Sequence, residues 1–244
     1  MQVAGNKTQQ FDSRCTMPAQ ASSICDLIYA VHNFGINPET RELFLHSYMS
    51  DAEEEPGVDW RMATKLQKNL SLLTSGSRAT DPILIHMHTI GGNWEDGLAI
   101  YDTIKSCTET HITILSYAHA RSMSSIIFQA GDTRIFMPNT IWLMHMGAQA
   151  FDGDAQSFEA EADEAKLDHD RMLDIYVNSA YDSVAYKGKS RKQVKVLIDK
   201  GLRFKQEWYM SPKEAIRHGY GDAVFGDGGY ADMNAIFPRQ NTDK

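Results

Sequence analysis

Short runs of apolar residues recur along the chain at the length of β-strands. Turn-forming residues bound most of them, for example the glycine pair Gly91-Gly92 and the pair Pro138-Asn139. Apolar runs of this length between turn signals are typical of buried strands. We therefore expect strands at residues 43–46, 82–89, 111–119, 133–140, 141–148 and 202–210.

Segments with apolar residues at helical spacing alternate with these runs. We expect helices at residues 21–35, 60–76, 94–107, 124–131, 154–186, 190–201 and 211–219. The last of them has clear end signals, because Ser211 stands at the N-cap, with Pro212 first and Glu214 in the capping-box place. Gly219 follows as the stop signal. The order of strand, turn, helix and strand predicts crossover units on a largely parallel sheet, and hence an α/β fold.

Length and composition indicate one globular domain. The chain has 244 residues, of which 42% are hydrophobic and 23% charged, and it contains neither internal repeats nor low-complexity linkers. We expect a flexible arm at residues 1–20, a single domain at 21–230 and a C-terminal tail at 231–244. The N-terminus has no apolar signal-peptide segment, and no apolar run approaches the ~20 residues that cross a bilayer.

Charge and cysteine content narrow the class of protein. The formal net charge of −8 argues against a general nucleic-acid binder, whose surface would be basic. The three cysteines lack metal-ligand spacing, and their odd number fits reduced thiols. We therefore expect an acidic protein of the cytoplasm or of an organelle matrix, with no membrane segment, no metal site and no cofactor.

The long helix expected at residues 154–186 is acidic, and a small domain's own core cannot cover it. A helix that projects from the domain and packs on another subunit would bury its apolar stripe. The sequence therefore indicates self-association.

Candidate chemistry lies where two expected strands end, at Gly91-Gly92 and at Ser122. In α/β folds ligands bind at this edge, and a glycine pair lets backbone N–H groups face an oxyanion. Neither a phosphate-loop motif nor a dinucleotide-binding motif is present. Taken singly, the glycines also fit a tight turn, Ser122 a helix cap, and His145 a structural histidine. Taken together, Ser122 and His145 supply the nucleophile and the base that hydrolysis of an acyl group needs.

Several ordered motifs between residues 41 and 226 resemble those of the ClpP peptidases, the proteolytic subunits of ATP-dependent Clp proteases. They are the segments GGNWEDGLAIYDTI, ARSMSSIIFQAG, RIFMPNTIWLMHMG and WYMSPKEAIRHGYGD. The resemblance implies a ClpP/crotonase-like fold of repeated ββα units with a projecting handle helix at about 154–186. It also implies a serine endopeptidase that hydrolyses peptides or unfolded proteins inside a homo-oligomeric chamber of one or two heptameric rings. A hexameric Clp-type ATPase is the partner that the family implies.

The resemblance assigns roles residue by residue. Ser122 falls on the nucleophile and His145 on the general base, and the N–H groups of Gly92 and Met123 fall on the oxyanion hole. The third member of the family's triad is an aspartate, but Glu207 stands at that position here. Asp199, eight residues earlier, is the alternative orienting acid. We favour Glu207, because the motif after it aligns without a gap.

Other positions depart from the family's pattern. Ile90 replaces a proline, Asn93 a serine and Ser124 a glycine. Arg121 replaces a small residue beside Ser122. Its side chain either reaches a carboxylate, that of an orienting residue or of a substrate terminus, or simply lies over the turn that holds Ser122. The interval between the base and the acid is about a dozen residues longer than usual, and the N-terminal segment shows no match. These departures leave a second hypothesis open, a ring subunit that is catalytically impaired and has a structural or regulatory role. A crotonase-type acyl-CoA enzyme would share the fold, but the sequence has no signal for a CoA site.

Overall fold

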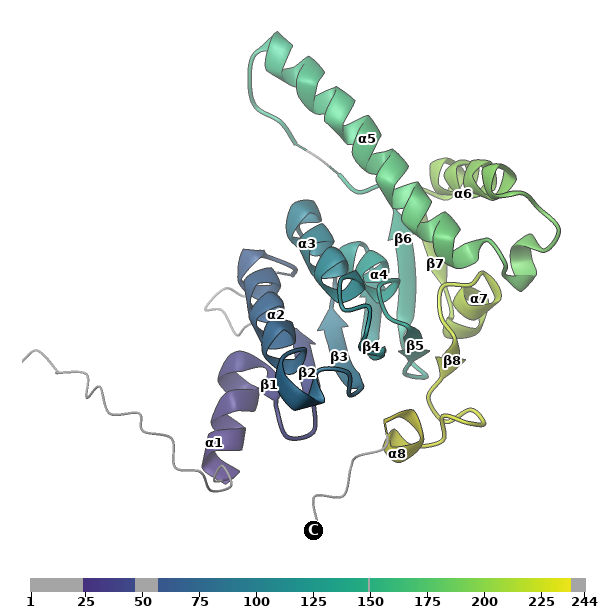
Figure 1. Cartoon of the computed structure of the whole chain (residues 1–244). Helices are drawn as coiled ribbons and strands as arrows, with labels where there is room; N and C mark the ends of the chain where they lie inside the picture. The colour runs from purple at the N-terminus through teal and green to yellow at the C-terminus, as the bar shows by residue number, and fades with distance from the viewer. Residues whose placement is uncertain (1–23, 47–56, 149, 238–244) are drawn as a thin grey trace, which may run out of the picture.

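The computed structural model of the chain describes residues 24–46, 57–148 and 150–237, and the arm expected at residues 1–20 lies outside them. Helices cover one face of a mixed sheet, and one long helix projects beyond the sheet (Figure 1). This arrangement confirms the expected α/β fold class.

In the part of the chain that the structure describes, eight strands form one branched sheet. They are β1 (Ile36–Asn37), β2 (Glu42–His46), β3 (Ile83–Thr89), β4 (Ile112–Arg121), β5 (Thr133–Phe136), β6 (Ile141–His145), β7 (Glu207–Met210) and β8 (Ala223–Val224). The order along the main path is β1-β2-β3-β4-β5-β8, and β2 to β8 run parallel within it. The first part of β4 pairs with β5, whereas its last residues pair with β6, which in turn pairs antiparallel with β7. The branch therefore brings β6 and β7 to the carboxyl end of β4.

The helices are α1 (Ile24–Tyr29), α2 (Trp60–Leu73), α3 (Trp94–Lys105), α4 (Met123–Phe128), α5 (Ala155–Ala180), α6 (Arg191–Lys205), α7 (Pro212–Arg217) and α8 (Met233–Ile236). A π-helical turn follows α1, and 3₁₀ turns follow α2 and α5. In α7 the expected capping box is present, because Ser211 and Glu214 bond each other's backbone N–H groups. Gly219 after this helix has a φ of 86°, as a helix stop requires.

The sheet buries apolar residues on both faces. Ile83 and Ile85 of β3 belong to the main core beneath the helices, whereas Leu84 between them points to the opposite face. A separate apolar cluster there contains Leu84, Leu115, Ile135, Ile236 and Phe237. The last two residues lie in and next to α8, within the segment expected to be a tail. That expectation is wrong for residues 233–237, because their apolar side chains cover this face of the sheet.

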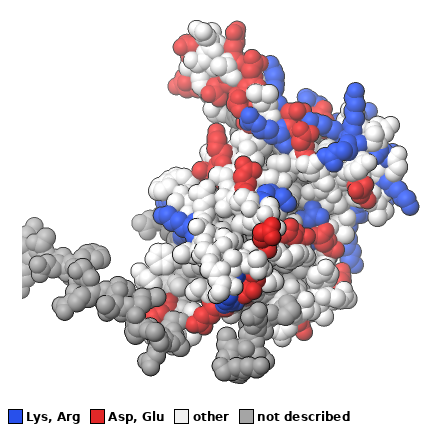
Figure 2. All heavy atoms as spheres, in the orientation of Figure 1, with Lys and Arg blue, Asp and Glu red and all other residues white. Residues whose placement is uncertain are grey.

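The projecting helix α5 is exposed along its first half and packed along its second. Its buried residues begin at Met172, and it ends at Ala180 rather than near residue 186. Figure 2 shows acidic side chains gathered over the projecting end and Lys and Arg side chains gathered over the neighbouring α6. The handle-like shape expected from the sequence is thus present, and α6 lies against its base.

The strand expected at residues 202–210 is wrong in its first half. The helix α6 continues to Lys205, because Leu202 extends the buried stripe of Val194 and Ile198 by one more turn. Only Glu207–Met210 form the strand β7.

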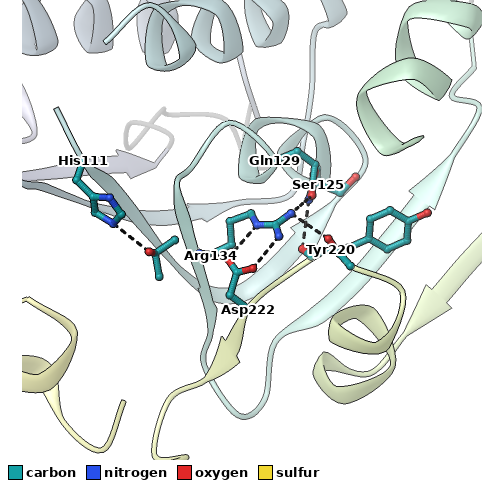
Figure 3. Close-up of polar contacts among 8 residues, drawn as sticks. His111, Ser125, Gln129, Arg134, Tyr220 and Asp222 are labelled. Carbon is teal, nitrogen blue, oxygen red and sulfur yellow. Dashed lines mark hydrogen bonds and ion pairs between the residues drawn. The ribbon is translucent and has the colours of Figure 1, made fainter. Parts of the chain in front are cut away.

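Arg134 of β5 connects this strand to Asp222 near the C-terminal end of the described chain and to Gln129 at the end of α4 (Figure 3). Its guanidinium donates to both carboxylate oxygens of Asp222, at 2.8 and 3.0 Å, and to the side-chain oxygen of Gln129 at 2.7 Å. Gln129 caps the end of α4 and donates to the carbonyl of Ser125 at 3.0 Å. Because α4 begins beside Ser122, this ion pair helps to fix the helix on which the site is built.

Candidate active site

Ser122 stands alone between a strand and a helix. The strand β4 ends at Arg121 and α4 begins at Met123, so the turn between them consists of this one residue. Its φ of 52° and ψ of −130° are strained for a residue with a side chain. The Ser122 hydroxyl makes no hydrogen bond to the helix that follows, so Ser122 does not act as the side-chain cap that serines at this position usually provide.

Hydrogen bonds hold this strained turn from several directions. The N–H of Ser122 donates to the carbonyl of Leu143 at 3.0 Å. The Ser122 carbonyl accepts from the N–H of Ser125 at 3.0 Å and from its hydroxyl at 2.6 Å. The hydroxyl of Ser124 accepts from the N–H of Arg121 at 2.8 Å and donates to its carbonyl at 2.6 Å. Ser124, which replaces the family's glycine, therefore links the start of α4 to the end of β4 across the turn.

His145 ends β6, which lies beside the last residues of β4. The register pairs Arg121 with Leu143, so the end of β6 lies next to the turn at Ser122. Nε2 of His145 lies 2.7 Å from Oγ of Ser122, which is hydrogen-bonding distance. The imidazole side chain is 26% exposed, so the pair lies at the surface of this chain rather than in its core.

Glu207 faces the other ring nitrogen of His145. In the antiparallel pairing of β6 with β7 the two residues stand directly opposite each other. Oε1 of Glu207 lies 4.0 Å from Nδ1 of His145, within ion-pair range but too far for a hydrogen bond. The side chain of Glu207 is 55% exposed, so water weakens its hold on the imidazole.

Asp199, the alternative acid, is engaged elsewhere. One carboxylate oxygen lies 2.7 Å from Nε2 of His169 on α5. Nε of Arg203 donates a shared hydrogen bond to the two carboxylate oxygens, at 3.0 Å each. Burial raises the pKa of Asp199, but the bonds from Arg203 and His169 outweigh it, and the pKa is lowered overall. Asp199 therefore joins α6 to α5.

The glycine pair lies against the same turn. Gly91 has a φ of 107° and Gly92 a φ of 150°, both in the region that favours glycine. A Cβ on Gly91 would lie 2.7 Å from Cβ of Ser122, and one on Gly92 would collide with the backbone of Val58. The absence of a side chain on Gly91 thus allows the chain to approach Ser122, and the absence of one on Gly92 allows it to approach Val58.

The packing of α4 on α3 positions Met123, whose N–H group lies at the start of α4. A Cβ on Gly97 of α3 would collide with the side chain of Met123, so the glycine makes room for it. Within the described residues, the N–H groups of Met123 and Gly92 donate to no backbone carbonyl. Backbone N–H groups without a carbonyl partner near a hydroxyl suit a negatively charged oxygen.

Asn93 and Arg121, two of the departures from the family's pattern, have identifiable surroundings. The side chain of Asn93 caps α3 by accepting the N–H of Asp96 at 2.9 Å. Arg121 lies on the same sheet face as Leu143 and Tyr209, its cross-strand neighbours. Within the described residues its guanidinium forms no ion pair, and its Nε is buried without an acceptor.

Sequence reasoning missed three hydroxyls around the site. Tyr209 donates to Glu207 at 2.8 Å, and the alternation of side chains along a strand places these two residues on one face. Ser125 bonds the Ser122 carbonyl, a contact typical of serines three residues apart in a turn. Tyr176 bonds Ser125 at 2.7 Å from 51 residues away, and no local pattern signals such a contact.

Known proteins resemble this chain in sequence. The family model described as Clp protease matches residues 53–227. An ATP-dependent Clp protease proteolytic subunit of Deinococcus radiodurans is 30% identical over 169 residues, which cover 68% of this chain and 76% of the relative. The proteolytic subunit 2 of Pseudomonas aeruginosa is 27% identical over 165 residues, which cover 67% of this chain and 74% of the relative.

A solved structure shares the fold. A mutant of ClpP1 from Listeria monocytogenes superposes with a TM-score of 0.61, covering 82% of this chain and 96% of its own. The two sequences are 21% identical, so this likeness concerns the fold alone. No helix among the residues that the structure describes is long and apolar enough to span a membrane.

Proposed function

The chain belongs to the Clp protease family, and on that premise we propose that it is a serine endopeptidase. The observation that carries the proposal is the 2.7 Å contact between Oγ of Ser122 and Nε2 of His145. A serine hydroxyl becomes a nucleophile when a base within hydrogen-bonding reach takes its proton. The strained turn presents Ser122 to that base and keeps its hydroxyl free of the helix.

The proposed reaction follows from this placement. Ser122 attacks the peptide carbonyl while His145 takes the hydroxyl proton, which it later gives to the departing amine. The N–H groups of Gly92 and Met123 stabilise the oxyanion of the tetrahedral intermediate. Glu207 faces Nδ1 of His145, so it favours the ring tautomer in which Nε2 can accept the proton. Water then attacks the acyl carbon while His145 takes its proton, and His145 returns that proton to Oγ of Ser122 as the carboxylic acid product leaves.

Assembly forms part of the proposal. The relatives are named proteolytic subunits of ATP-dependent proteases, which suggests that this chain also works with an ATPase of the Clp type. We infer a homo-oligomeric ring, one or two heptamers, that encloses the sites and restricts them to peptides and unfolded proteins. The exposed first half of α5, with Phe158 60% and Leu167 53% exposed, supports contact with another subunit.

A catalytically impaired ring subunit is the second candidate. The 4.0 Å separation of Glu207 from His145, together with the exposure of Glu207, favours it. An active-site contact of this kind often shortens only when substrate is bound, so the separation does not by itself exclude catalysis.

Labelling with a serine-directed fluorophosphonate tests the proposal. We expect an adduct on Ser122 in the assembled protein, none in Ser122→Ala, and an unchanged adduct in Ser106→Ala, a matched variant of an exposed serine. Glu207→Gln should lower kcat on the order of 10³-fold if Glu207 orients the base. Absence of labelling in well-assembled wild-type protein would favour the impaired subunit.

A further inference from the structure

The carboxylate of Glu207 must be held toward His145, which is harder for a glutamate than for an aspartate. Glu207 has one more rotatable bond than an aspartate, and more than half of its side chain is exposed. Free rotation about these bonds would spread the carboxylate over many positions, of which few face His145. A second group that restricts the carboxylate would therefore increase the fraction of time that it faces His145.

Tyr209 supplies such a restriction. Its hydroxyl donates to Oε2 of Glu207 at 2.8 Å, while the other oxygen, Oε1, is the one that faces Nδ1 of His145. The two carboxylate oxygens are thus divided between the tyrosine and the histidine. The hydrogen bond to Glu207 raises the pKa of Tyr209, so the phenol keeps its proton at neutral pH and remains a donor.

The strand that carries both residues is anchored from its other face. Trp208 lies between them in β7 and points to α6, where the absence of a side chain on Gly201 makes room for its ring. The amine of Lys205 lies 5.0 Å from the centre of the same ring. Because side chains alternate along a strand, Glu207 and Tyr209 project from the opposite face of the sheet, the face that also carries His145.

We propose that Tyr209 is a positioning residue that adapts a glutamate to the role of the triad acid. The inference rests on the proposed function, in which Glu207 orients His145. Tyr209 touches neither the substrate carbonyl nor Ser122, and it acts by holding the Glu207 carboxylate in place. Its role depends on the length of the residue at position 207, because a shorter aspartate would draw the carboxylate away from the phenol.

That dependence gives the test, a double-mutant cycle of Tyr209→Phe with Glu207→Asp. In the wild-type background we expect Tyr209→Phe to lower kcat about fivefold, with KM changed less than about twofold. In the Glu207→Asp background the same change should alter kcat by less than about twofold. Tyr29→Phe, an exposed tyrosine on α1, is the matched control. The rate of fluorophosphonate labelling serves as a second readout where turnover is too slow to measure.

The outcomes separate the proposal from its premise. Equal losses in both backgrounds would show a structural role for Tyr209, and no loss in the wild-type background would show no role, so either overturns the inference. If Glu207→Gln keeps full activity while Ser122 is labelled, another group orients the base, and the inference fails although the peptidase function stands. If Ser122 is never labelled, the proposed function fails and the inference with it.

Discussion

The hydroxyl of Tyr176 on α5 donates a hydrogen bond to the hydroxyl of Ser125 at 2.7 Å. The direction follows because Ser125 uses its own proton on the carbonyl of Ser122, at 2.6 Å. Tyr176 and Ser125 are almost completely buried, with 1% and 0% of their surfaces exposed. The base of the projecting helix is thus connected by two hydrogen bonds to the residue expected to be the nucleophile.

Removal of this connection should affect both stability and reactivity. In Tyr176→Phe, the free energy of unfolding should fall by about 1 kcal/mol, the net value of a typical hydrogen bond. The Ser125 hydroxyl would then be free to turn from the Ser122 carbonyl, so we expect labelling of Ser122 by a fluorophosphonate to slow severalfold. Denaturant unfolding and labelling kinetics measure the two effects.

Tyr117→Phe provides the control for this prediction. Tyr117 also shares one hydrogen bond, with Nδ1 of His86 at 2.9 Å, on the face of the sheet away from Ser125. It should lose similar stability without a change in labelling. Equal slowing in both variants would mean that reactivity follows global stability and not the contact between Tyr176 and Ser125.

Local signals in the sequence predicted much of this architecture. The capping box at Ser211 and the start of the strand β6 at Ile141 follow from residues close together in the chain, so a pattern of a few positions reveals them. The strand ends at His145, three residues earlier than the expected end at residue 148. The end of α6 was missed because polar residues surround the last buried leucine of its stripe. The helix α8 was missed because a single turn of four residues is too short to show a helical periodicity.

In the candidate site, too, some features could be predicted from the sequence and others depend on the folded chain. The resemblance placed Ser122 and His145, and the structure brings them to 2.7 Å. The approach of Glu207 to His145 depends on the register of β6 with β7, which joins segments about sixty residues apart that no local pattern can align. The bond from Tyr176 to Ser125 depends on how α5 packs, and only the folded chain specifies it.

The packing of α3 on α4 gives a second prediction, based on Gly97. In an exposed helix, Gly→Ala stabilises by about 1 kcal/mol, because glycine is a poor helix former. Here a Cβ would collide with the side chain of Met123, so we expect Gly97→Ala to destabilise by about 1–3 kcal/mol instead. Displacement of Met123 should also move the N–H that we propose to face the oxyanion, and it should slow the labelling of Ser122.

Shortening Met123 tests whether this collision is the cause. In a Met123→Ala background the space beside Gly97 is open, so Gly97→Ala should there stabilise the protein rather than destabilise it. The reversal of sign is read from denaturant unfolding of the four proteins of the cycle. The same loss in both backgrounds would mean that the alanine disturbs something other than Met123.

Asp199 gives the third prediction, because its bonds to His169 and Arg203 join α5 to α6. The pKa of Asp199 is lower in the folded chain than in the unfolded one, so folding favours its ionised form. Its contribution to stability is therefore present above the unfolded value of about 3.9 and is lost as the pH falls through the lower folded value. We expect Asp199→Asn to lower the free energy of unfolding by about 1 kcal/mol at pH 7.

The difference between Asp199→Asn and wild type should begin to shrink as the pH falls below about 4, where Asp199 of the unfolded chain takes up a proton. It should vanish below the lower pKa of the folded chain, where the folded carboxylate is neutral as well. Asp163→Asn is the matched control, because Asp163 and its partner Lys166 are each 76% exposed, and its effect should be close to zero at every pH. Labelling of Ser122 should be unchanged in Asp199→Asn, because the carboxylate of Asp199 faces α5 and not His145. A loss of labelling comparable to that in Glu207→Gln would make Asp199 the acid that orients the base and would overturn the role proposed for Glu207.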